Sequence, residues 1–291
     1  MRVHHLNCGT MCPVGRRVMN GEGSIFAPAR LVCHCLAVET GEGILLVDTG
    51  LGLRDIEDPR GRLGGGFVAM VRPALEERET AVRQIEGLGF KREDVRHIVP
   101  THLDSDHAGG LADFPDAKVH VYDAELEAAL APRTVLERER YRQTQWAHGP
   151  AWDRRKLEGD VWFGFDAVRA VPGLGDEVLL VPLMGHTRGH CGVAVKTGDR
   201  WLLHGGDSFF YFGEVLPDAP HCPAGLRAFQ RIMAVDNAQR VANQARLREL
   251  ARAHCDEVQI VSAHCPFTFD RLTVRGPRFA AARGRVVPAE A

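Results

Sequence analysis

The sequence predicts an α+β fold in which two β-sheets pack together and helices cover their outer faces. Two observations predict it: short apolar strands come in two blocks along the chain, and each block is followed by helical patterns. A single parallel sheet would instead alternate strands and helices throughout, so two separate sheets are favoured.

The first block occupies the N-terminal part of the chain. Its strands are apolar runs bounded by turn residues. Its first helix is expected to begin at Pro73, which needs no amide partner in a first turn, and to end at Gly87 and Gly89. The elements predicted here are strands over 31–38 and 44–47, a loop over 61–66, a helix over 73–89, strands over 95–100 and 119–122, and a helix over 124–130.

The second block follows a less regular segment. Its predicted elements are strands over 178–183, 192–196 and 201–203, a long helix over 225–253, and a strand over 258–262. The segment before it, 132–166, carries an amphipathic helical pattern over 135–146 and a cluster of aromatic residues. We therefore expect one domain over 1–291 with an insertion near 132–166. This insertion either covers a site as a lid or forms a packed surface such as a homodimer interface.

Composition excludes several classes of protein. The 36 basic and 38 acidic residues give a formal net charge of -2, which provides no electrostatic argument for a nucleic-acid partner. No apolar stretch approaches the length of a membrane span, and the N-terminus has no apolar core of an export signal, so we expect a cytoplasmic protein without a membrane partner. The eight cysteines form no CxxC pair and are expected to be reduced and mostly buried.

The densest group of polar residues is the run THLDSDHAGG over 101–110, directly after a predicted strand. Four of its side chains, those of His102, Asp104, Asp106 and His107, offer imidazole nitrogen or carboxylate oxygen, the donors that suit zinc and similar divalent ions. A tight loop can point several side chains to one place, whereas a strand directs neighbours to opposite faces. The run therefore predicts a metal-binding loop.

Three weaker signals follow other predicted strands. They are GHTRGH over 185–190, GGD over 205–207 and SAH over 262–264. A lone histidine at a strand end is more often structural than a ligand. Together with the first loop, however, these signals place donors at four separate strand ends, as a shared site requires. The candidate donors they add are His186, Asp207 and His264.

These runs resemble the signatures of a known family. HLDSDH over 102–107 resembles the HxHxDH signature of the metallo-β-lactamase superfamily, with aspartate in place of the second histidine, and DTG over 48–50 resembles its earlier aspartate motif. GHT over 185–187 resembles a third motif, and all of them occur in the family's order across nearly the whole chain. The resemblance implies an αβ/βα sandwich of two mixed sheets flanked by helices, with the site along one edge of the sheets.

The resemblance also implies a binuclear centre that holds two divalent ions, with Zn²⁺ the first candidate. One ion is implied at His102, Asp104 and His186, the other at Asp106, His107 and His264, and Asp207 is implied to bridge both. Asp48 is implied to hold the metal loop by hydrogen bonds. His190 is common in the motif and is not expected to be a ligand.

Asp104 departs from the family pattern, which has histidine at that position. Two divalent ions, three aspartates and a bridging hydroxide give a neutral core, whereas histidine at 104 would leave one positive charge. A neutral core is expected to acidify its water less and to tolerate Mn²⁺ or iron. A site with one metal and an unbound Asp104 stays open as an alternative.

The resemblance implies hydrolysis, in which a metal-bound hydroxide attacks the carbonyl of an ester or lactone. Asp106 is the first candidate catalytic residue, because it can orient the water or pass a proton to the leaving group. Lactonases of this superfamily often carry a tyrosine three residues after the bridging aspartate. Phe210 stands there in this chain and Tyr211 follows it, so Tyr211 is the second candidate.

Several alternatives stay open at this point. The same fold hydrolyses phosphotriesters, thioesters and β-lactams, although β-lactamases are usually exported. A mononuclear iron dioxygenase and a non-catalytic ligand-binding protein are alternatives from other classes. The complete set of donors favours a hydrolase that acts on a small molecule.

Overall fold

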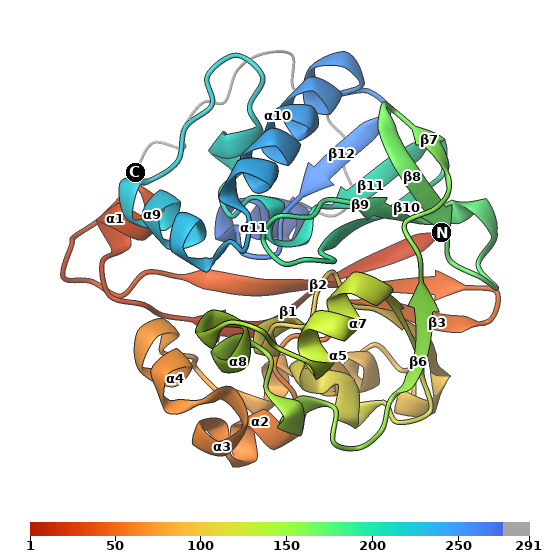
Figure 1. Ribbon diagram of the computed structural model, residues 1–291, viewed down its shortest axis with the longest axis horizontal. Helices are drawn as coiled ribbons and strands as arrows, with labels where there is room; N and C mark the ends of the chain where they lie inside the picture. Colours follow the sequence, from red (N-terminus) through yellow and green to blue (C-terminus); the bar gives the residue numbers. More distant parts are fainter. Residues whose placement is uncertain (276–291) are drawn as a thin grey trace.

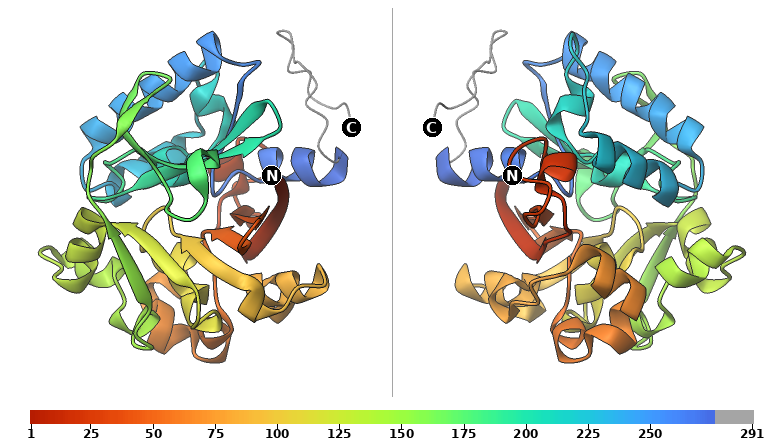
Figure 2. Two further views of the ribbon diagram at one scale, coloured as in Figure 1. Left: turned by 90° about the vertical axis from the view of Figure 1, so that its right-hand side faces the viewer. Right: turned by 90° about the vertical axis from the view of Figure 1, so that its left-hand side faces the viewer.

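The computed structural model describes residues 1–275, which form two six-stranded sheets packed face to face with helices on their outer faces (Figure 1). The side views show the layers most clearly (Figure 2). This arrangement confirms the predicted αβ/βα sandwich.

The strands and helices have the following bounds. The strands are β1 (Arg2–Met11), β2 (Leu31–Thr40), β3 (Gly43–Val47), β4 (Val95–Val99), β5 (Lys118–Tyr122), β6 (Ala151–Arg155), β7 (Asp160–Trp162), β8 (Phe165–Ala170), β9 (Val178–Pro182), β10 (Cys191–Thr197), β11 (Arg200–His204) and β12 (Val258–Val261). The helices are α1 (Arg16–Asn20), α2 (Leu53–Glu57), α3 (Pro59–Leu63), α4 (Gly65–Val71), α5 (Ala81–Gly87), α6 (Ser105–Ala108), α7 (Asp123–Leu130), α8 (Val135–Arg140), α9 (Ala224–Met233), α10 (Asn237–Ala253) and α11 (Pro266–Arg275).

Both sheets are mixed. The first has the order β1-β2-β3-β4-β5-β6, with antiparallel pairs up to β3 and parallel pairs from β3 to β6. The second has the order β12-β11-β10-β9-β8-β7, in which only β11 and β12 are parallel neighbours. Strands β9, β11 and β12 therefore run in one direction. As in the first sheet, the carboxyl ends of several strands meet at one edge.

Alternation along the central strands builds the core. In β3, Leu45 and Val47 face the second sheet, while Ile44 and Leu46 face the helices on the other side. Successive strand residues point to opposite faces, so a strand covered on both sides reads as a continuous apolar run. This explains why the sequence at 44–47 carries no polar residue.

Helices complete the outer layers. On the first sheet, α5 and α7 bury Ile85 and Leu126 in the same apolar cluster as the strands. On the second, α10 packs Leu247 and Leu250 beside Leu203 of β11. The faces of both sheets are therefore covered by packed side chains. A site can form at the edges of the sheets or at the loops beyond the strand ends.

Several predicted elements differ from the structure for identifiable reasons. The expected helix over 225–253 is broken into α9 and α10, because Ala234 is extended and Asp236 caps α10 by accepting the amide of Gln239 at 3.0 Å. The expected loop over 61–66 is instead the junction of α3 and α4, at Gly64 with φ 88°. The helix expected from 73 begins at Ala81.

Strands β1, β6, β7 and β8 are not among the elements predicted from the sequence. Strand β1 carries polar residues on both faces and is half buried at five of its ten positions, so its pattern does not alternate cleanly. The segment 132–166 also differs from the predicted insertion. Its helix ends at Arg140, β6 forms one edge of the first sheet, and β7 forms one edge of the second. The segment therefore passes from one sheet to the other.

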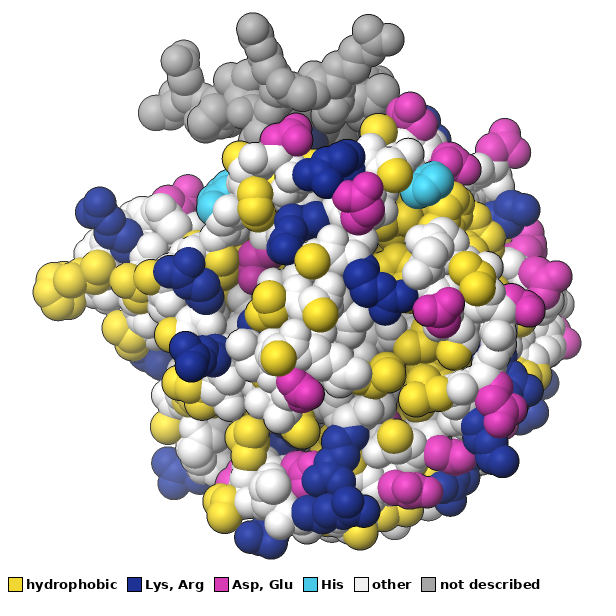
Figure 3. Space-filling view, turned by 45° about the horizontal axis from the view of Figure 1, so that its top comes forward, with side chains coloured by type: hydrophobic (Ala, Val, Ile, Leu, Met, Phe, Trp, Pro, Cys, Tyr) yellow, Lys and Arg dark blue, Asp and Glu magenta, His cyan; other side chains and the backbone are white. Residues whose placement is uncertain are grey.

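The surface carries both signs of charge. On the face shown in Figure 3, basic and acidic side chains lie among apolar ones over most of the area. The loop between α1 and β2 projects from the body and exposes Ile25 by 50% and Phe26 by 85%. Among residues 1–275, no helix is long and apolar enough to cross a bilayer.

Ile98 provides a test of the core. It lies in the middle of β4 and is fully buried, whereas Ile232 on α9 is 71% exposed. We expect Ile98→Ala to lower the free energy of unfolding by about 2–5 kcal/mol, since a buried isoleucine leaves a cavity. Ile232→Ala makes the same chemical change and is expected to cost less than about 0.5 kcal/mol. Urea unfolding curves of the two variants measure the difference, and equal losses would contradict this account of the core.

Candidate metal centre

Five strands deliver polar residues to the same edge of the sandwich. Asp48 follows β3, the metal loop at 101–107 follows β4, His186 follows β9, Asp207 follows β11, and His264 follows β12. All seven predicted metal ligands are buried there, none more than 8% exposed: His102, Asp104, Asp106, His107, His186, Asp207 and His264.

Local sequence shapes the metal loop. After β4 the chain turns into the one-turn helix α6, and Asp104 stands at its N-terminal cap with extended backbone. Gly109 and Gly110 follow because the neighbouring loop leaves no room for side chains. A Cβ at Gly109 would lie 2.1 Å from a carboxylate oxygen of Asp55, and one at Gly110 would lie 2.9 Å from the carbonyl oxygen of Thr49.

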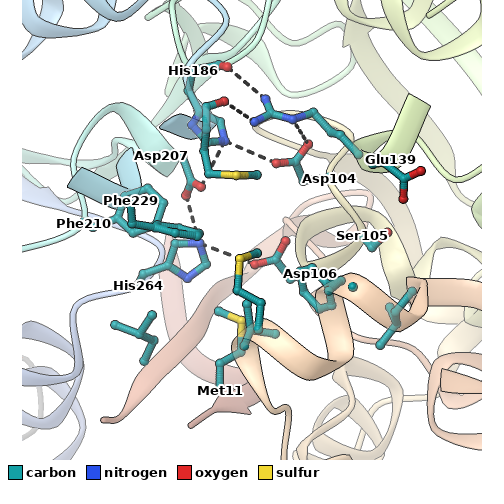
Figure 4. A pocket seen from close by; sticks show the side chains of 18 of the residues that line it. Met11, Asp104, Ser105, Asp106, Glu139, His186, Asp207, Phe210, Phe229 and His264 are labelled. Atoms are coloured by element: carbon teal, nitrogen blue, oxygen red, sulfur yellow. Dashed lines mark hydrogen bonds and ion pairs between the residues drawn. The ribbon is translucent and has the colours of Figure 1, made fainter. Parts of the chain in front are cut away.

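One group of donors gathers around Asp104 (Figure 4). Its Oδ2 lies 3.3 Å from Nε2 of His102. The same oxygen lies 3.2 Å from Nε2 of His186, a contact that Figure 4 shows. Asp207 joins them, because its Oδ2 lies 3.3 Å from Nε2 of His186. One atom each of His102, His186 and Asp207 could reach a single ion.

A second group uses the other oxygen of Asp207. Its Oδ1 lies 3.1 Å from Nε2 of His264 and 3.4 Å from Nε2 of His107. Oδ2 of Asp106 completes the group at 3.6 Å from Nε2 of His264. Asp207 therefore lies between the two groups of donors and presents one carboxylate oxygen to each.

Two of the donor atoms that face these positions make no hydrogen bond within the described chain. Nε2 of His102 and Oδ1 of Asp207 are buried and accept or donate no hydrogen bond within residues 1–275. Buried polar atoms are costly when unpaired, so such atoms converging from separate strands fit cation binding. Imidazole nitrogen and carboxylate oxygen are also ligands of zinc and related divalent ions. The residues present therefore fit a metal centre.

The electrostatics of the cluster also favour a cation. Burial opposes ionisation of Asp207, but His264 and His107 outweigh it and hold the pKa of Asp207 well below its usual range. Burial likewise disfavours charge on His107, yet Asp207 and Asp48 raise the pKa of its imidazole well above the ordinary value. The carboxylates of the cluster therefore carry an excess of negative charge. A proton on His107 offsets part of this charge, and a bound cation would do the same.

Hydrogen bonds behind the histidines orient their rings. Nδ1 of His107 donates to Oδ2 of Asp48 at 2.8 Å, and Nδ1 of His264 donates to the carbonyl of Val32 at 2.8 Å. With Nδ1 protonated, Nε2 carries the lone pair toward the cluster. Asp48 also accepts the amide of Thr101 at 2.6 Å, and its own backbone has φ 58°, a conformation that non-glycine residues seldom adopt.

Glu125 is a buried carboxylate that the sequence analysis missed. Its Oε1 accepts the amide of Leu103 at 2.9 Å and the hydroxyl of Tyr141 at 3.0 Å. Its Oε2 accepts the amide of Gly189 at 3.0 Å. One side chain on α7 therefore ties the metal loop to the loop that carries His186. In the sequence it looks like any other glutamate of a surface helix.

Arg140 is a second buried group that the sequence did not reveal. It ends α8 in the segment 132–166, and its Nε lies 3.2 Å from Oδ1 of Asp104. Its Nη1 donates to the carbonyl of His186 at 2.9 Å, and its Nη2 donates to the carbonyl of Met233. Burial opposes ionisation of Asp104, but Arg140 and then His102 hold the pKa of its carboxyl well below the usual range.

A cavity of about 320 Å³ opens over both metal positions. Asp104, Asp106, His186, Asp207 and His264 line its polar side (Figure 4). Its other walls are mostly apolar and come from β1, β2, α3, α4, α8 and α9 together with Phe210. The apolar lining residues are Met11, Leu31, Leu63, Phe67, Met70, Val71, Leu136, Phe210, Phe229 and Met233.

The structure does not bring Tyr211 to the cluster. Its ring packs against Phe212, His221 and Phe267, and Phe210 is the aromatic residue that lines the cavity, with its ring 4.6 Å from that of His264. The backbone is extended at Phe209 and at Tyr211. Neighbouring side chains in extended backbone point to opposite sides, so Phe210 faces the cavity and Tyr211 points away from it.

His190 and Cys33 also lie near the cluster, and they differ in whether they face its donor atoms. His190 does not face it as a ligand, since its Nδ1 donates to the carbonyl of Leu183 and its Nε2 accepts the amide of Asp207, both at 2.8 Å. Cys33 of β2 was not anticipated. Its thiol, Asp106 and His264 offer ligand atoms within 4.8 Å of one another.

Comparison with known proteins identifies the family. Residues 28–271 match the model of the metallo-beta-lactamase superfamily. The chain belongs to the metallo-β-lactamase superfamily, as its motifs indicate, and its buried histidine and aspartate clusters are those of a metal-dependent hydrolase.

Among its relatives is a protein of Mycobacterium tuberculosis described as a probable metallo-hydrolase, 46% identical over 266 residues that cover 91% of this chain and 81% of the relative. The N-acyl homoserine lactonase AiiA of Bacillus thuringiensis is 30% identical over 191 residues, 64% of this chain and 68% of that protein. A crystal structure of B. thuringiensis AiiA with N-decanoyl-L-homoserine at the active site shares the fold, with a TM-score of 0.68 at 22% identity, covering 92% of this chain and 95% of that one.

Glu125→Ala tests the link between the two ligand loops. The change leaves three buried donors without an acceptor, and each such donor costs about 1–3 kcal/mol, so we expect the free energy of unfolding to fall by about 3 kcal/mol or more. Zinc affinity is expected to fall about 10-fold to 100-fold, because the loops that carry the ligands lose their common support. Thermal unfolding and competition with a zinc chelator measure both effects.

Glu127→Ala is the matched control, since Glu127 lies on the same helix with its side chain 67% exposed in a surface ion pair with Arg154. It is expected to leave both quantities nearly unchanged. Equal zinc affinity in the Glu125 and Glu127 variants would show that the hydrogen bonds of Glu125 do not contribute to the metal centre.

Proposed function

We propose that this protein is a metal-dependent hydrolase that cleaves the ester bond of a lactone, or of another small ester, carrying an apolar acyl group. The observation that carries the proposal is the cavity, whose polar side is the metal cluster and whose other walls are apolar. Ligand sites of this kind combine a few placed polar groups with a mainly apolar lining. The identity with N-acyl homoserine lactonases supports the same substrate class.

Two divalent ions, with Zn²⁺ the first candidate, are proposed at the two groups of donors. Bound there, they lower the pKa of water so that hydroxide is available near neutral pH, and they polarise the substrate carbonyl. The chain's own residues do the rest. His102, Asp104 and His186 would hold one ion, and Asp106, His107 and His264 would hold the other, with Asp207 shared between them.

Asp106 is the proposed catalytic residue of the chain. It lines the cavity, and its Oδ2 stays within 3.9 Å of both His107 and His264, so its carboxylate can orient the attacking water. During hydrolysis the acyl carbon gains the hydroxyl group, the acyl C–O bond breaks, and the leaving oxygen takes up a proton. Asp106 is placed to accept the water's proton and pass it to that oxygen.

The apolar walls are proposed to bind the acyl group. Phe67 and Met70 of α4 and Phe229 and Met233 of α9 face the cavity from opposite sides. Burial of each methylene of an acyl chain contributes about 0.8 kcal/mol. Substrates with longer acyl chains are therefore expected to bind more tightly until the cavity is filled.

The proposal is tested by assaying zinc-loaded protein on N-acyl homoserine lactones of increasing chain length, an unsubstituted lactone, aryl esters, thioesters, phosphotriesters and β-lactams. We expect the highest kcat/KM on the acyl lactones or acyl esters. We also expect His107→Ala to abolish activity and lower the metal content, and Tyr211→Phe to retain activity. Preference for a thioester or phosphotriester would contradict the proposed substrate class. A single bound iron with oxygen consumption would contradict hydrolysis itself.

Phe229→Ala tests the acyl site. Removing this ring from the cavity wall is expected to raise KM for a long-chain acyl lactone about 10-fold, which corresponds to about 1.4 kcal/mol, while kcat stays within about two-fold. KM for the unsubstituted lactone is expected to stay the same. Phe26→Ala is the matched control, because Phe26 is 85% exposed on the loop between α1 and β2. An equal rise of KM for both lactones would place the acyl group elsewhere.

A further inference from the structure

The aspartate at position 104 poses a problem of charge. Where the family signature has a neutral histidine, this chain has Asp104, whose side chain is only 12% exposed, in a cluster that already holds Asp106 and Asp207. Like charges in a buried site disfavour one another, and removing a charge from water is costly unless it is paired. A third carboxylate therefore calls for a compensating cation close by.

Arg140 is that cation. Its side chain is 1% exposed, and its Nε lies 3.2 Å from Oδ1 of Asp104. The other oxygen of Asp104, Oδ2, faces Nε2 of His102 and His186. The carboxylate is thus divided between two tasks: one oxygen pairs with the guanidinium, and the other is directed at the first metal position.

The contact of Arg140 Nε with Asp104 is an ion pair and not a hydrogen bond, and the two Nη groups hold the guanidinium in place. Nη1 donates to the carbonyl of His186 and Nη2 to that of Met233. Arg140 therefore contacts two residues of the first metal position: the side chain of Asp104 and the backbone carbonyl of His186. A planar guanidinium suits this task, because its donors are held in a fixed fork, whereas an ammonium group is a point charge on a flexible chain.

We propose that Asp104 and Arg140 form one unit that replaces the histidine of the family signature, with Arg140 as a positioning residue that directs Asp104 to the first metal. Three carboxylates and one guanidinium leave the same net charge around the two positions as two carboxylates and a neutral histidine. The unit therefore restores the charge that Asp104 alone would remove. It also makes Asp104 a ligand through one oxygen only.

The inference rests on the proposed metal centre, and a double-mutant cycle tests it. The variants are Asp104→His, Arg140→Met and the double variant. Each single change is expected to weaken zinc binding at one of the two positions about 10-fold to 100-fold: Arg140→Met frees the carboxylate, and Asp104→His leaves a buried guanidinium without its partner. The double variant removes both charges and restores the family's ligand, so its zinc affinity is expected to return to within about three-fold of wild type.

Zinc affinity is measured by competition with a chelator, zinc content by elemental analysis, and folding by thermal unfolding of the metal-free proteins. Arg138→Met is the matched control, since Arg138 lies on the same helix and is exposed; it is expected to bind zinc like wild type. Additive losses in the double variant, or wild-type affinity in Arg140→Met, would overturn the proposal.

Arg140→Lys covers the case in which Arg140→Met does not fold. Lysine keeps the positive charge and loses the fork, so affinity is expected to lie between wild type and the single losses. The combination of Asp104→His with Arg140→Lys is expected to stay weak, because histidine then faces an unpaired cation. Recovery in that combination would overturn the proposal. Zinc binding by wild type without hydrolysis of any ester would instead count against the proposed function. The double-mutant cycle would still be informative, because it is measured by zinc affinity and not by activity.

Discussion

The structure depends on a single constraint: three carboxylates and four imidazoles lie together in one cluster beside the cavity, and none of these residues is more than 8% exposed. Such a group is unstable unless a cation joins it and the rings are turned so that their lone pairs meet. The surrounding residues meet this constraint. Asp48 and the carbonyl of Val32 fix the histidine rings, and Arg140 balances one of the carboxylates.

The scaffold explains why this group can form at all. The central strands of both sheets bury apolar side chains on both of their faces. The polar residues lie on loops beyond the carboxyl ends of the strands, where backbone is free to turn. Buried strands fix where each loop starts, and Glu125 then holds two of these loops at a set distance.

Much of this arrangement could be predicted from the sequence, because strand ends and metal-binding residues leave local signals. The loop at 101–107 combines four donors with a preceding apolar run, and His186, Asp207 and His264 each follow such a run. Three of the edge strands, β1, β6 and β7, could not be predicted, since their half-buried positions carry mixed polarity. The helix over 225–253 was predicted as continuous because a cap at Asp236 does not interrupt the apolar spacing.

The supporting residues were invisible for a different reason. Glu125 and Arg140 stand in charged helical stretches, where glutamate and arginine usually face solvent, and only tertiary contacts reveal that both are buried. Arg140 had one indirect signal, because replacing histidine by aspartate at 104 alters the charge of the core. Tyr211 was misplaced by one position, since the sequence does not show which of two adjacent aromatic rings points inward.

The ligands are shared between the two halves of the sandwich. The loop after β4 belongs to the first sheet, whereas His186, Asp207 and His264 belong to the second. An ion bound between them would cross-link the two halves. Its binding free energy would then add to the free energy of unfolding. The lifetime of the folded chain in a cell is then tied to the supply of that ion, quite apart from any reaction it assists.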